Sequence, residues 1–161
     1  MGMSAGGGRQ QLEQLSEQIE ELEEQRQQLQ AAVEGLREQI TEIDEAIEGL
    51  ELLETDSTVQ VPVGGGAYVR ATVEDIEEVV VELGGGYAAE QSREDAIDTL
   101  ENKQDSIEER IEELEGEIEE LNEESARLEQ QAQQTQQELM QQLQQQQGGG
   151  LGGLGGGGDD E

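Results

Sequence analysis

The chain contains no Cys, no His, no Trp and no Phe, and its aromatic residues are Tyr68 and Tyr87. A packed globular core needs large side chains, so this sequence cannot build a core of ordinary size. His and Cys supply the commonest general base, the best thiol nucleophile and the usual zinc ligands. No loop has the spacing of carboxylates that a Ca²⁺ site requires. We therefore expect no enzyme, with no catalytic residue, no cofactor and no metal.

Long apolar runs are also missing. No stretch approaches the run of roughly 18 apolar residues that is needed to span a bilayer. Residues 1–8 lack the charged region and the apolar region of a secretory signal. We therefore expect a cytoplasmic protein.

Basic residues are scarce: the chain has 8 Lys and Arg residues and 41 Asp and Glu residues. Its formal net charge is therefore −33. Nucleic acids and anionic membranes would be repelled, so we expect neither as a partner. Long exposed helices are often rich in Glu, which is one explanation. Lys is as good a helix former as Glu, however, so this explanation does not account for a sequence in which Lys103 is the single Lys. This scarcity favours adaptation to molar salt, where the Debye length falls to roughly 3 Å and self-repulsion is screened.

Two long heptad repeats dominate the residues that are present. Apolar residues alternate spacings of three and four from Leu12 to Leu50, and the same spacing recurs from Ile97 to Leu139. This spacing keeps one seam of a helix facing a partner helix. The middle of the chain cannot be helical throughout, so the sequence predicts one antiparallel coiled coil, with Leu50 level with Ile97. Arg26 interrupts the seam at a heptad a position, as a register device or as a neighbour for Glu.

Between the two repeats the apolar period changes from 3.5 to 2. The Gly triplets 64–66 and 84–86 supply the positive φ angles that tight hairpins require. The segment also repeats itself, because Val-Pro-Val-Gly-Gly-Gly at 61–66 matches Val-Glu-Leu-Gly-Gly-Gly at 81–86. The sequence therefore predicts two β-hairpins. Their predicted oligomerisation strands contain Val59, Val61, Val63, Val69, Val73, Val79, Val81 and Leu83.

The predicted fold class is α+β, a long antiparallel coiled-coil hairpin with two central β-hairpins. Two hairpins cannot bury enough apolar surface to stand alone, and they expose strand edges. Strands from other chains would complete a closed sheet, so we expect obligate oligomerisation. Ser92 is a candidate N-cap of the second helix. The predicted segments are a flexible lead at 1–8, helix one at 9–54, the hairpins at 55–91, helix two at 92–147 and a Gly-rich flexible acidic tail at 148–161.

This order of elements resembles the alpha subunits of archaeal prefoldin over about residues 9–145. Residues 61–71 are similar to the first hairpin of that family, 79–90 to its second hairpin, and 94–97 to the start of its second helix. Ala88 and Ala89 stand where bulkier β-branched residues are expected. The resemblance implies a hexamer of two alpha and four beta subunits, in which the hairpins join an intersubunit β-barrel. It also implies an ATP-independent chaperone, a holdase, that passes unfolded client proteins to a group II chaperonin.

The open ends of the two helices are the predicted client-binding site. The predicted register pairs large residues of helix one with small or polar residues of helix two, namely Leu22 with Ser125, Leu15 with Ala132 and Leu12 with Thr135. Loose, Met-containing apolar surface suits promiscuous binding. The predicted client-binding residues are Leu12, Leu15, Leu22, Leu139, Met140 and Leu143, the last three extending beyond the pairing. The alternatives are an end that simply frays, and a structural or scaffold coiled coil without client binding.

Overall fold

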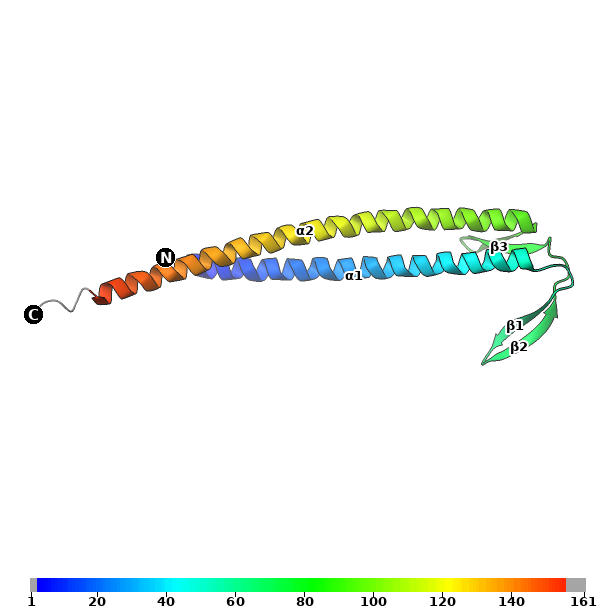
Figure 1. The fold of residues 1–161 in the computed structure, drawn as a ribbon, viewed down its shortest axis with the longest axis horizontal. Coiled ribbons are helices and arrows are strands. Elements are labelled where there is room, and N and C mark those ends of the chain that lie inside the picture. Colours follow the sequence, from blue (N-terminus) through cyan, green and yellow to red (C-terminus); the bar gives the residue numbers. More distant parts are fainter. Residues whose placement is uncertain (1–2, 156–161) are drawn as a thin grey trace, which may run out of the picture. The chain divides into compact units, whose positions relative to one another are not determined.

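The computed structural model describes residues 3–155, with side chains over residues 7–146. Its elements run in the order α1 (Met3–Leu52), β1 (Thr58–Gly64), β2 (Ala67–Thr72), β3 (Val79–Gly84), β4 (Tyr87–Gln91) and α2 (Arg93–Gly155), as Figure 1 shows. The predicted order of helix, two hairpins and helix is confirmed.

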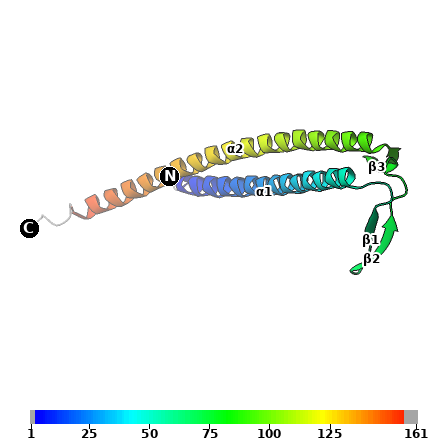
Figure 2. The ribbon, with the colours of Figure 1, turned by 45° about the vertical axis from the view of Figure 1, so that its right-hand side comes forward.

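The chain divides into two compact units. The first, here called the terminal unit, comprises residues 1–31 and 115–161, and the second, the hairpin unit, comprises residues 32–114. Both units contain a stretch of α1 that runs antiparallel beside a stretch of α2, which Figure 2 shows from a second direction. The predicted α+β class and the antiparallel helix pair are therefore confirmed.

Polar contacts across the seam fix the register inside each unit. In the hairpin unit, Nε2 of Gln104 donates to the carbonyl oxygen of Ile40 at 3.1 Å and to the carboxylate of Asp44 at 2.6 Å. In the terminal unit, Nη1 of Arg26 donates to Oδ1 of Asn122 at 3.3 Å. These pairs are those that the predicted register brings together.

Heptad spacing also decides which side chains are buried. Val33, Ile111 and Leu114 of the hairpin unit are buried, as are Leu15 and Thr135 of the terminal unit. All five lie at a or d positions, where each turn of a 3.5-residue repeat returns a side chain to the partner helix. Most burial thus follows a narrow stripe of each helix, and the Glu-rich remainder stays in solvent, whereas Ala96, 0% exposed near the start of α2, lies outside this stripe.

Each helix extends beyond its predicted free end, whereas α1 stops at Leu52, two residues before its predicted end, and α2 starts at Arg93, one residue after its predicted start. Residues 3–8 belong to α1 and residues 148–155 belong to α2, where we expected a flexible lead and a flexible tail. The physical reason is that extending a formed helix adds one hydrogen bond for each residue fixed, without a new nucleation cost. Close helix approach also favours Gly8, because a Cβ there would lie 2.7 Å from Cδ2 of Leu139. The rest of the predicted tail, residues 156–161, lies outside the described residues.

The two hairpins share one turn geometry. The strands pair antiparallel as β1 with β2 and β3 with β4, and each pairing shifts register just before its turn. At the turns Gly65 and Gly66 have φ of 60° and 80°, and Gly85 and Gly86 have 63° and 81°. Two consecutive positive φ angles define the type I′ turn, whose twist matches that of the flanking strands. Strand β4 pairs along its length despite Ala88 and Ala89.

The start of α2 is capped and joined to the end of α1. The predicted N-cap is confirmed, because Oγ of Ser92 accepts from the backbone N–H of Asp95 at 3.2 Å. One residue later, Nη2 of Arg93 donates to the carbonyl oxygen of Leu53 at 2.6 Å. Asp56 takes a positive φ of 75° where the chain turns from α1 into β1, a conformation that Asp tolerates better than most residues. These local contacts set where the hairpins leave the helix pair.

Candidate interaction surfaces

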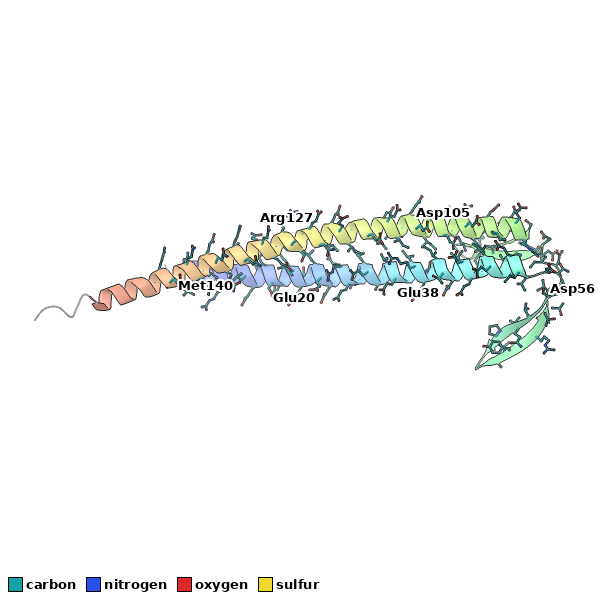
Figure 3. The ribbon with its side chains drawn as sticks, in the orientation of Figure 1. Glu20, Glu38, Asp56, Asp105, Arg127 and Met140 are labelled. Atoms are coloured by element: carbon teal, nitrogen blue, oxygen red, sulfur yellow. The ribbon has the colours of Figure 1, made fainter. Side chains whose placement is uncertain are left out.

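The open end of the terminal unit presents two exposed apolar side chains. Met140 is 63% exposed and Leu143 is 48% exposed, and Figure 3 labels Met140 on the last part of α2. Leu139 is half-buried because it packs over Gly8 of α1. The expectation that Leu139 has no partner on α1 is thus corrected, since α1 begins earlier than predicted. Met140 and Leu143 remain as accessible apolar surface.

The predicted residues of α1 lie deeper in the seam. Leu12 and Leu22 are half-buried, while Leu15 is only 5% exposed. Leu15 is therefore not accessible when the helices are paired, contrary to the expectation of an open seam.

The seam is under-filled farther along the terminal unit. A cavity of about 80 Å³ has a lining that includes Ile19, Leu22, Arg26, Leu121, Asn122 and Ser125. This is the place where the sequence pairs Leu22 with Ser125. Arg26 donates a hydrogen bond to Asn122, and its Nη2 lies 3.3 Å from the carboxylate of Glu23. The Nε of Arg26 is buried without a hydrogen-bond partner. Arg26 thus neighbours Glu23, which was one of the two predicted roles, and it also contacts Asn122 across the seam.

The first hairpin carries an exposed apolar face. Val61 pairs with Val69 across the two strands, and they are 44% and 52% exposed. Val63 is 63% exposed, and Val59 is half-buried opposite Ala71. Val73 falls just outside β2, although its backbone N–H still donates to the carbonyl oxygen of Ser57 at 2.9 Å. A two-stranded sheet with such a face is the kind of surface that another chain covers.

The second hairpin differs because part of it is buried by its own chain. Val81 is 6% exposed and Val79 is half-buried, whereas Val80, on the opposite face of β3, is 67% exposed. Leu83, at the turn, is 51% exposed. A groove of about 760 Å³ separates β3 from the helices, and its lining includes Ile43 of α1, Glu82 and Leu83 of β3, and Lys103 and Ile107 of α2.

The described residues contain neither a cluster of metal ligands nor a membrane-spanning helix. No group of three or more Asp, Glu, His or Cys side chains among them is arranged to hold a metal ion. No helix within the same residues has the length and apolar character required to cross a membrane.

Comparison with known proteins identifies similar sequences. A family model described as prefoldin subunit matches residues 22–138. A prefoldin subunit alpha from Halorubrum lacusprofundi is 55% identical over 99 residues, which are 62% of this chain and 65% of that protein. Another from Haloarcula marismortui is 51% identical over 94 residues, 58% of this chain and 61% of that one. A third, from Halobacterium salinarum, is 56% identical over 99 residues, with coverage of 62% and 64%. The matched segment spans a little less than two thirds of each relative.

A solved structure shares the fold. A chain in a cryo-EM structure of filamentous PFD from Methanocaldococcus jannaschii superposes with a TM-score of 0.50 and is 29% identical. The match covers 74% of this chain and 95% of that chain. The family match includes Leu22 and every predicted strand residue, but it excludes Leu12, Leu15, Leu139, Met140 and Leu143.

Proposed function

This chain belongs to the prefoldin family and is similar to its alpha subunits, and we propose that it is a subunit of an ATP-independent holdase. In this proposal the assembled protein binds unfolded clients at the open ends of its coiled coils and delivers them to a group II chaperonin. Two copies of this chain combine with four beta subunits. The observation that carries client binding is the exposure of Met140 and Leu143 at the open end of the terminal unit.

The energetics of this surface suit weak, reversible binding. Burying one large aliphatic side chain on a client gains roughly 1.5–3 kcal/mol. Two such side chains, with half-buried Leu12 and Leu139 nearby in the same unit, provide modest affinity for one helix pair. Several copies in one assembly would add to this affinity through a high effective concentration of the second site. A holdase needs this combination, because each contact must also release its client.

The hairpins supply the reason for assembly. Val61 and Val69 face the same side of the first hairpin and are exposed in the isolated chain. An isolated two-stranded sheet is marginally stable in water. Pairing of these strands with strands of other subunits in a closed barrel would cover both the apolar face and the open edges.

A paired set of variants tests client binding. Met140→Ser with Leu143→Ser removes the exposed apolar area and leaves the hairpins unchanged. The matched control is Gln141→Ser with Gln144→Ser, which places Ser at neighbouring exposed helix positions without loss of apolar area. Both variants are assembled with partner subunits, and light scattering then follows aggregation of a denatured client in molar salt. We expect the first pair to lose most of the protection that the parent gives, and the control pair to keep it.

The same assay separates the holdase from a scaffold coiled coil. Burial of Leu15 and half-burial of Leu22 are what an ordinary coiled-coil end would also show. If the parent assembly never suppresses aggregation, the scaffold function is favoured. If the parent protects clients and the Met140 and Leu143 variant protects equally well, the holdase function stands but its site lies elsewhere.

A further inference from the structure

The acidic surface of this chain stops abruptly along α2. Residues 101–129 contain thirteen acidic and three basic residues, a net charge of −10. Residues 130–146 contain one charged residue, Glu138, and eleven of these seventeen residues are Gln. Every one of these Gln side chains is exposed. In the facing stretch of α1, residues 7–16, Arg9 and Glu13 offset each other.

This neutral stretch surrounds the exposed apolar residues. Gln136 and Gln137 lie four and three positions before Met140, and Gln144 lies four positions after it, so all three neighbour Met140 on the helix surface. Leu143 lies among the same side chains. Gln and Glu have nearly the same helix propensity, so helix formation does not explain why Glu is replaced by Gln here. The change removes charge from one surface while keeping side-chain size and polarity.

We propose that residues 130–146, in which Glu138 is the one charged residue, form a docking surface of low charge for acidic unfolded polypeptides, an inference that rests on the proposed holdase function. The solvent conditions that favour a net charge of −33 on this chain act on the other proteins of the same compartment, so its clients carry many carboxylates. Elsewhere along α2 such a client meets dense carboxylates, and it is repelled at contact distances, within the Debye length of roughly 3 Å that remains in molar salt. At residues 130–146 it meets Gln side chains, which are polar but carry no charge that would repel it.

Charge substitution at constant shape tests this surface. Gln136→Glu, Gln137→Glu and Gln144→Glu together add three carboxylates around Met140. The matched control adds three carboxylates to exposed positions of α1 in the same unit, namely Gln25→Glu, Gln27→Glu and Gln28→Glu. Two probes are used, an unstructured Glu-rich polypeptide and a counterpart in which every Glu is Gln. Binding of each probe to the assembled full-length chain with its partner subunits is measured at several salt concentrations.

We expect the Gln136, Gln137 and Gln144 variant to bind the Glu-rich probe about threefold to tenfold more weakly than the parent does, and the neutral probe equally well. The loss should shrink as salt rises, because screening shortens the range of repulsion. The α1 control should bind both probes like the parent.

Two results would overturn this inference and leave the holdase proposal standing. One is equal loss of both probes, which would mean that the Gln amides matter and not their neutrality. The other is no loss of either probe while the parent binds both. A parent that binds neither probe would overturn the holdase proposal together with this inference.

Discussion

The guanidinium of Arg93 donates a hydrogen bond from Nη2 to the backbone carbonyl oxygen of Leu53, at 2.6 Å. Leu53 directly follows α1, and Arg93 is the first residue of α2. The last carbonyl groups of a helix have no partner within the helix, and a cation close to them is favourable. One side chain therefore satisfies the end of one helix from the start of the other.

Replacing Arg93 with Met should lower the free energy of unfolding by about 1–3 kcal/mol, because a partly buried charged hydrogen bond is lost. Thermal or denaturant unfolding of the assembled protein measures this change. The matched control is Arg110→Met, which removes an ion pair between Arg110 and Glu113. Their side chains are 55% and 66% exposed, respectively. Exposed pairs contribute little, so the control should change stability by less than about 0.5 kcal/mol. Equal effects of the two variants would contradict a special role for Arg93.

The turn of the first hairpin offers a test of backbone conformation alone. Gly65 has φ of 60°, and a Cβ built there meets no atom within 4 Å. Gly65→Val should therefore destabilise the hairpin by about 1–2 kcal/mol through left-handed backbone strain, whereas Gly65→Asn should be tolerated. The yield of assembled complex on co-expression with partner subunits measures the difference. If Val and Asn behave alike, this turn does not limit assembly.

Removal of salt should unfold the chain or dissociate its assembly. Glu20 of the terminal unit and Glu38 and Asp105 of the hairpin unit all project outward, as Figure 3 shows, so unscreened carboxylates repel one another along each helix. Circular dichroism from molar to millimolar salt should record a loss of helix. Replacing Glu119 and Glu120 with Gln should make the loss smaller. A spectrum that stays constant over this range would contradict adaptation to high salt.

The isolated chain should not be a stable folded monomer. Its strands form two separate two-stranded sheets, and Val61, Val63 and Val69 are all at least 44% exposed. Sedimentation at micromolar concentration should show larger species or aggregation. Co-expression with beta subunits should give a complex with the mass of two alpha and four beta subunits. A folded monomer at this concentration would contradict the need for partner strands.

Much of the fold could be predicted because its signals are local. The Gly triplets at 64–66 and 84–86 mark two turns, and alternating Val residues mark the strands beside them. The heptad spacing continues without a slip, and it fixes the helix pairing because a slip would move the apolar seam into solvent. Ser92 indicates the start of α2 because Ser is a preferred N-cap residue, and its Oγ accepts the expected hydrogen bond from the backbone N–H of Asp95.

Features that depend on neighbours in space could not be predicted. Gly8 indicated a flexible lead, yet its missing side chain makes room for Leu139. Leu15 is only 5% exposed, although the predicted register places the small residue Ala132 opposite it. Val81 and Val61 occupy matching places in the repeat, but only Val81 is buried by its own chain. The bond from Arg93 to Leu53 has no sequence signal beyond a lone cation near two helix ends.

The two hairpins repeat each other in residue order, strand pairing and turn geometry. Duplication of a short stretch of the gene, about twenty codons long, would produce this repeat from a single ancestral hairpin. A chain with the repeat offers two similar pairs of strands, so one subunit presents two hairpin edges at which strands of other chains could pair. After such a duplication one copy is free to diverge, and the different burial of Val61 and Val81 is the kind of divergence that would follow.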